Sequence, residues 1–168
     1  MELKALNESR VCEILNEIVE YEMAGVVRYA HSSLMVSGPY RLPIVAFLQE
    51  QANESLTHAL EAGELITGFG GHPSQVIADI KENHIHSIKQ ILQESLQHEQ
   101  YAISLYKKLL EEVIFFGISL GADFVELFIE NSDNSSVLAE EDFITSVSPS
   151  FGKGAGIRIF KDKRDGFV

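Results

Sequence analysis

The stretch FLQEQANESLTHALEAGELITGF, residues 47–69, decides how the rest of the chain is interpreted. At helical spacing, one stripe has apolar ends and a polar middle: Phe47, Gln51, Glu54, His58, Ala62, Leu65 and Phe69. A second stripe is apolar throughout: Val45, Leu48, Ala52, Leu56, Ala59, Gly63 and Ile66. Because apolar residues lie on two sides, we expect a mostly buried helix. Glu54 and His58 share one face of it, where burial without a partner is costly, and a metal ion would be a suitable partner.

A long amphipathic helix is predicted before this stretch, over residues 7–36. Asn7 is a suitable N-cap, and Ser37-Gly38-Pro39 ends the helix. Pro43 suits the first turn of the central helix. The apolar stripe of the first helix is interrupted by one acid, Glu22: Val11, Leu15, Ile18, Glu22, Val26, Tyr29, Ser33 and Val36.

A third long helix is predicted from about residue 82, after a connection with a short helical turn at residues 74–80. Its stripe again holds one carboxylate: Ile88, Leu92, Leu96, Glu99, Ile103, Tyr106 and Leu110. Taken singly, each acid is more simply a boundary residue. Taken together, carboxylates that converge would repel one another, and a pair of ferrous or manganous ions would satisfy them.

Composition narrows the class of protein. The chain has 168 residues, 45% of them apolar, with a net charge of −12 and a single cysteine. The charge disfavours nucleic acid and anionic membranes as partners. The single thiol, Cys12, cannot form an internal disulfide, and the first ten residues lack the apolar segment of a signal peptide. The longest apolar run, residues 113–120, is too short to cross a bilayer. We therefore expect a cytoplasmic globular protein.

Three segments carry a resemblance to a known family: EYEMAGVVRYAHSSLMV (20–36), EQANESLTHALEAGELITGFGGHP (50–73) and ILQESLQHEQYAISLYKKLLE (91–111). Over residues 7–113 the chain resembles the bacterioferritin-like branch of the ferritin-like di-iron superfamily. In that family the first helix gives one Glu with a Tyr seven residues later, which Glu22 and Tyr29 match. The third helix gives one Glu, matched by Glu99.

The second helix departs from the family pattern. The family has Glu-x-x-His there; His58 matches the His, but Ser55 occupies the Glu position and the nearest acid is Glu54. The Met that ligates haem in true bacterioferritins aligns with Leu56, so we expect no haem.

The resemblance implies a metal site made by Glu22, Glu54, His58 and Glu99. It would bind a pair of iron ions, with manganese or zinc as alternatives, and would oxidise Fe(II) with O₂ or peroxide. Glu22, Glu99 and Tyr29 are assigned to catalysis, Tyr29 by hydrogen bonding to a ligand.

The family's second Glu-x-x-His motif, expected soon after residue 113, is absent. We therefore predict a mainly α fold: a ferritin-like antiparallel bundle of three long helices without the fourth, followed by a small antiparallel β-rich segment. A homo-oligomer, at least a dimer, would complete the bundle with helices of a second copy.

The composition changes after residue 113. Residues 114–120 would extend the third helix or form a short one, with Gly121 after its end. Residues 123–130, 136–140, 143–148 and 156–161 are predicted as strands and 131–135 and 163–166 as turns, and residues 167–168 would begin a strand that the chain does not complete.

GADFVELFIE (121–130), GAGIRIF (154–160) and the closing GFV resemble the start of the TldD/PmbA family of metalloproteases, over about 118–168. The family's His-Glu-x-x-x-His helix is absent, so this likeness implies no proteolysis. We expect two family fragments, residues 1–113 and 114–168, joined near residue 113, and the incomplete last strand suggests truncation or fusion.

Several alternatives remain open. A non-catalytic helical domain with a β interaction module is the main rival. A rubrerythrin-like peroxidase would need rubredoxin-type cysteines, and Cys12 alone excludes the internal version. Glu94 and His98 are interpreted as a solvated pair, with an outer metal contact as the alternative, and His84 and His86 as surface residues. His31 fits either ordinary core or a position behind the metal ligands.

Overall fold

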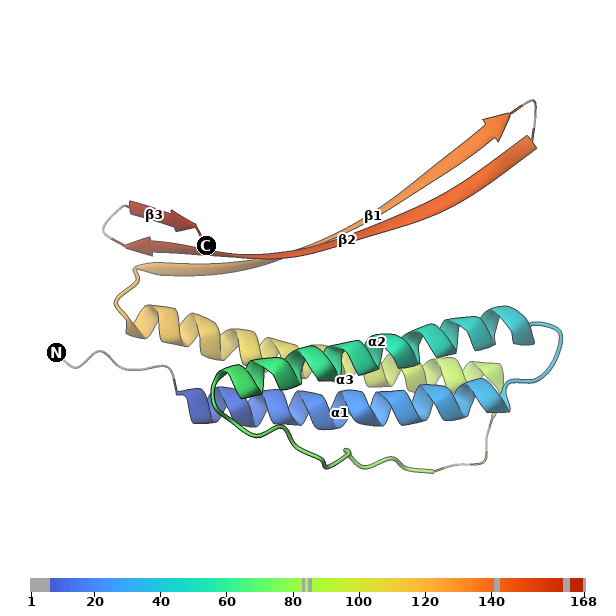
Figure 1. Ribbon diagram of the computed structural model, residues 1–168, viewed down its shortest axis with the longest axis horizontal. Helices are drawn as coiled ribbons and strands as arrows, with labels where there is room; N and C mark the ends of the chain where they lie inside the picture. The colour runs from blue at the N-terminus through green and yellow to red at the C-terminus, as the bar shows by residue number, and fades with distance from the viewer. Residues whose placement is uncertain (1–6, 83, 85, 141–142, 162–163, 168) are drawn as a thin grey trace. The chain divides into compact units, whose positions relative to one another are not determined.

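The computed structural model describes residues 7–82, 84, 86–140, 143–161 and 164–167. Its helices are α1 (Glu8–Met35), α2 (Arg41–Gly68) and α3 (Ile88–Ser119), followed by strands β1 (Phe124–Glu140), β2 (Phe143–Lys161) and β3 (Arg164–Phe167) (Figure 1). The predicted fold class, long helices followed by a small antiparallel β segment, is confirmed. The chain divides into two compact units, Leu6–Glu112 and a second that contains Val113–Val168.

The first helix follows its sequence closely. The Asn7 side chain accepts a hydrogen bond from the Arg10 backbone N–H at 3.1 Å, as an N-cap should. The predicted stripe is buried from Val11 to Val36, with Val26 half-buried. Ile14, Leu15 and Ile18 are almost wholly enclosed and contact Ala62 and Ile66 of α2 and Leu105 of α3 in one apolar cluster. The buried face of α1 is therefore the centre of the helical unit.

A short connection turns the chain back, so that α2 packs antiparallel to α1 (Figure 1). Gly38 has φ of +94°, a conformation that suits glycine, and Pro43 lies in the first turn of α2, as predicted.

The long connection between α2 and α3 runs along α1. Asn16 holds it twice: its side-chain oxygen accepts from the Ser74 N–H at 2.7 Å, and its amide donates to the His72 carbonyl at 3.3 Å. The Ala78 N–H donates to the Glu20 carbonyl at 3.0 Å. The predicted helical turn at 74–80 is wrong, because this backbone bonds to α1 instead. The third helix begins at Ile88, later than the predicted residue 82.

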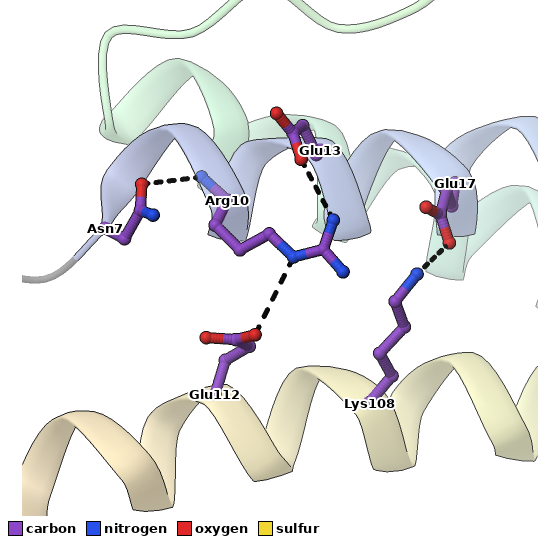
Figure 2. Close-up of polar contacts among 6 residues, drawn as sticks. All are labelled: Asn7, Arg10, Glu13, Glu17, Lys108 and Glu112. Atoms are coloured by element: carbon purple, nitrogen blue, oxygen red, sulfur yellow. Dashed lines mark hydrogen bonds and ion pairs between the residues drawn. The ribbon is translucent and has the colours of Figure 1, made fainter.

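Contacts along α1 and α3 show that these two helices are antiparallel. Near one end, the Arg10 guanidinium lies 3.7 Å from Glu112, and the Lys108 ammonium lies 2.6 Å from Glu17 (Figure 2). Towards the other end, Ile91 packs with Tyr29 and Val36. Since α2 is antiparallel to α1, α2 and α3 run parallel, which explains why the connection between them must span the length of the bundle.

The buried face of α3 is not the predicted one. Ile91, His98, Ala102 and Leu105 are buried, one residue away from the predicted stripe, whereas Leu96 is 58% exposed. Leu92, Glu99 and Ile103 of the predicted stripe are exposed as well. The prediction failed because α3 is apolar on two faces, and only one of them contacts α1.

The same explanation applies to α2. Leu48, Ala59 and Ile66 of its all-apolar stripe are buried, but Phe47 and Leu65 of the mixed stripe are exposed. The expectation of a mostly buried central helix is therefore wrong for that face. Both helices keep an apolar face uncovered within a single chain.

In the second unit α3 continues to Ser119, and Gly121 follows with φ of +85° and an N–H bond to the Ile118 carbonyl at 2.9 Å. The extension of the third helix and its glycine are thus confirmed. Strand β1 pairs antiparallel with β2 from Phe124↔Phe160 to Glu140↔Phe143, and β2 pairs with β3. The turns predicted at 131–135 and 163–166 are wrong: the first lies inside β1, and residues 164–166 belong to β3. Cross-strand pairing overrides the local preference for a turn.

Two glycines give a test of the α1–α3 contact. A Cβ at Gly25 would lie 2.6 Å from His98 Nε2 and 2.8 Å from Ser55 Oγ, whereas a Cβ at Gly63 would meet no atom within 4 Å. We expect Gly25→Ala to lower the free energy of unfolding by about 1–3 kcal/mol, because the buried ring and hydroxyl cannot both move away. Gly63→Ala should raise it by up to about 1 kcal/mol, because alanine favours the helix.

Urea denaturation followed by circular dichroism measures both variants. Equal effects of the two substitutions would show that α1 and α3 do not approach as closely as described.

Candidate metal centre

The centre of the site is the Glu22 carboxylate on α1. Glu22 is only 4% exposed, and its Oε1 accepts a hydrogen bond from the Tyr106 hydroxyl of α3 at 2.9 Å. The same oxygen lies 3.4 Å from Nδ1 of His58 on α2. One buried acid therefore contacts side chains from both of the other helices.

The surroundings of Glu22 keep it charged. Burial alone would raise the pKa of its carboxyl, but hydrogen bonds from His58, Tyr106 and Ser55, with the charge of His58, outweigh burial and hold the pKa below its usual value. A buried carboxylate that stays ionised is in the protonation state that metal binding requires.

Glu99 lies on α3 and is exposed, but it is tied to the bundle by Tyr29. The Tyr29 hydroxyl of α1 donates to Glu99 Oε1 at 2.5 Å. Burial is the largest cause of a raised pKa for both Tyr29 and Tyr106, and the charges of Glu22 and Glu99 raise both pKa values further. The two carboxylates therefore act on the same pair of tyrosines, which keep their protons and donate to them.

The fourth sequence-predicted ligand is Glu54 on α2. Glu54 is exposed and accepts a hydrogen bond from Gln51 at 3.0 Å. Ser55, the next residue, is the one that is buried beside Glu22. His58 is 40% exposed at its side chain, so the face of α2 that carries it is open.

His98 is the residue that the sequence interpretation missed. It is 3% exposed, so the interpretation of Glu94 and His98 as a solvated pair is wrong. Its ring stacks on Tyr21 at a centroid distance of 4.3 Å and lies edge-on to Tyr29 at 5.6 Å. Burial lowers the pKa of the His98 imidazole. The sequence does indicate this second face of α3, because four residues recur there at helical spacing: Ile91, His98, Ala102 and Leu105.

Tyr106 was placed in the predicted apolar stripe of α3, but its bond to Glu22 was not foreseen. A tyrosine has an apolar ring and a hydroxyl that needs a hydrogen-bond partner when it is buried. A Tyr on the apolar stripe of one helix and an acid on the apolar stripe of another therefore indicate a hydrogen bond between the two helices.

The chemistry of the donors suits iron, since carboxylate and imidazole are ligands that iron accepts. Their number and placement in one chain do not complete a site. Within the part of the chain that the structure describes, no three His, Cys, Asp or Glu side chains gather closely enough to hold a metal ion. Glu22 and His58 are in contact, and Glu99 accepts a hydrogen bond from Tyr29 of α1. A single chain therefore offers a partial set of ligands.

The family model of the ferritin-like domain matches residues 12–135, most of the chain. The chain therefore belongs to the ferritin-like domain family.

The chain is also similar to a crystal structure of ferritin-like, diiron-carboxylate proteins from Bacillus anthracis str. Ames. The TM-score is 0.62 and the identity 25%, over 68% of this chain and 81% of that one. No curated protein matches the chain.

The β region carries a separate likeness. The family model of the PmbA/TldA metallopeptidase domain 1 matches residues 125–168, a range whose described residues belong to β1, β2 and β3. Among the described residues, no helix is long and apolar enough to cross a membrane.

Removal of the Tyr106 hydroxyl tests the electrostatics of the centre. Tyr106→Phe should lower the free energy of unfolding by about 1–3 kcal/mol, because a buried carboxylate loses a hydrogen-bond donor. Tyr101→Phe is the matched control, since Tyr101 lies on the same helix and is 53% exposed. Urea denaturation of the metal-free protein measures both, and a Tyr106→Phe variant as stable as the control would mean that the hydroxyl does not support Glu22.

Proposed function

We propose that this protein binds ferrous iron as a substrate and oxidises it with O₂ or peroxide. The observation that carries the proposal is the contact between the buried Glu22 carboxylate of α1 and the His58 imidazole of α2. Membership of the ferritin-like domain family supports it, as does the likeness to a protein described as diiron-carboxylate.

Each residue has a distinct role in this proposal. Glu22 and His58 are ligands from α1 and α2, and Glu99 is the ligand from α3. Tyr29 donates to Glu99 and Tyr106 donates to Glu22, so both tyrosines orient carboxylates. The apolar cluster around Ile14 and Leu105 excludes water from one side of the centre.

Glu54 remains a predicted ligand. It lies four residues before His58 on α2, so the two side chains share one face of the helix. To bind a metal ion, the Glu54 carboxylate would have to give up its hydrogen bond with Gln51 and adopt another rotamer. Its exposure leaves it accessible to a second chain as well as to iron.

We propose that a second copy of the chain completes the site. One chain brings too few donors together, and both α2 and α3 leave apolar side chains uncovered, among them Phe47, Leu65 and Leu96. Covering such faces with helices of a second copy would remove apolar surface from water and enclose His58 and Glu99. The resemblance favours iron as the metal and the bacterioferritin-like branch without haem.

A specific observation favours one rival. The family Glu is replaced by Ser55, and the described residues form no three-donor group, which is what a non-catalytic helical domain would show. In that case residues 114–168 would be a β interaction module attached to a packing domain. The two-part organisation at residue 113 is part of either proposal.

The rate of Fe(II) oxidation tests the proposal. Glu99→Ala should abolish rapid oxidation by O₂, because the α3 ligand is lost. Glu111→Ala, an exposed acid on the same helix, should leave the rate unchanged. Stopped-flow absorbance after mixing Fe(II)-loaded protein with oxygenated buffer measures all three proteins.

Iron content and native mass of the same samples separate the rivals. We expect about one iron or more per chain, on assemblies of at least two chains. Wild-type protein that holds well under one iron per chain and oxidises it no faster than buffer would establish the non-catalytic domain instead.

A further inference from the structure

A cavity of about 310 Å³ lies between α1, the connection before α3 and α3 itself. It belongs entirely to the Leu6–Glu112 unit. Its walls include Val27, Ile80 and Ile91, with the rings of Tyr29 and His98. The size is at the lower end of pockets that hold small molecules, and apolar walls with a few polar groups are typical of them.

The ring of His98 is part of the wall of this cavity, and its nitrogens are enclosed. Both of its ring nitrogens are buried and have no hydrogen-bond partner among the described residues, and the residue as a whole is 3% exposed. A buried polar atom that makes no hydrogen bond costs free energy comparable to the bond it lacks. Because neither nitrogen is accessible to solvent, His98 contributes its ring to the wall of the cavity and no hydrogen-bonding atom to a ligand.

Two cations lie at the same cavity. Arg28 on α1 is half-buried and Lys81 on the connection is exposed, and neither takes part in the ion pairs found among the described residues. Of the two acids at the cavity, Glu94 accepts a hydrogen bond from Gln90 at 2.8 Å, and Glu82 is exposed. In a chain of net charge −12, two cations without an ion-pair partner beside an apolar cavity favour an anionic ligand.

We propose that this cavity binds a small organic carboxylate with an aromatic or apolar body. The carboxylate pairs with Arg28 and Lys81, and the body lies against Val27, Ile80 and Ile91. A metal ion fits less well. The cavity is lined by His31, His86, Glu94 and His98, but no three of the described His, Cys, Asp or Glu side chains lie close enough together to hold a metal ion. The site is separate from the iron site, although Tyr29 borders both.

Titration with benzoate, followed by ¹H–¹⁵N NMR of the full chain, tests this proposal. We expect saturable shifts at the backbone of Val27, Arg28 and Ile91 and at the His98 ring. Benzamide, which has the same shape without the charge, should bind at least about tenfold more weakly. Arg28→Gln should weaken benzoate binding by a similar factor. Lys107→Gln, which removes an exposed cation of α3 outside the cavity, should change it less than about twofold.

The proposal is overturned by no saturable binding of benzoate, by equal binding of benzamide, or by shifts that survive Arg28→Gln unchanged. Lys81→Gln gives a second variant at an exposed position, so the contribution of the cations can be measured even if Arg28→Gln unfolds the protein. Shifts of His31, His86 and His98 with Zn²⁺ in place of benzoate would assign the cavity to a metal and overturn the carboxylate. None of these measurements depends on iron oxidation, so failure here is distinguishable from failure of the iron site.

Discussion

The burial of one carboxylate constrains the helical unit more than any other feature. An ionised acid inside a protein is costly unless hydrogen bonds and opposite charge surround it. Glu22 on α1 meets that condition through Tyr106 on α3 and His58 and Ser55 on α2. Because the partners come from two different helices, a shift of either helix along α1 would separate an acid from its partner. Glu22 therefore restricts the register of all three helices, in addition to serving as a candidate ligand.

The second constraint is the number of apolar faces. The core of a single chain is built from α1 and one face each of α2 and α3. The opposite faces expose Phe47 and Leu65 on α2 and Leu92 and Leu96 on α3. The same two helices carry His58, whose side chain is 40% exposed, and Glu99, which is also exposed. Incomplete packing and an incomplete set of metal ligands thus occur together, which is why one missing helix, supplied by a second copy, would account for both.

The sequence predicted well whatever depends on one helix at a time. The Asn7 cap, the buried stripe of α1 and Gly121 after α3 follow from local rules, and the structure has them. The choice between two apolar faces of α3 could not be made locally, since it depends on which helix packs there. For that reason the buried His98 was interpreted as solvated, and the bond from Tyr106 to Glu22 was not foreseen.

The strands show the same limit. Residues 131–135 have turn-forming composition, yet they lie inside β1, because pairing with β2 runs through them. Of the site residues, Glu22, His58, Glu99 and Tyr29 were chosen from a family resemblance and from spacing. Their contacts, and the exposed position of Glu54, required the structure.

Our central proposal is that Glu22 and His58 lie together because they hold iron, with Glu99 as the ligand from α3. The most direct measurement is anomalous X-ray diffraction at the iron absorption edge, from crystals grown with Fe(II) without oxygen. Our account predicts an anomalous peak within bonding distance of Glu22, His58 and Glu99 of one chain, with further ligands from a second copy. Iron found only at surface acids, with Glu22 still hydrogen-bonded to Tyr106 and no metal beside it, would contradict the account.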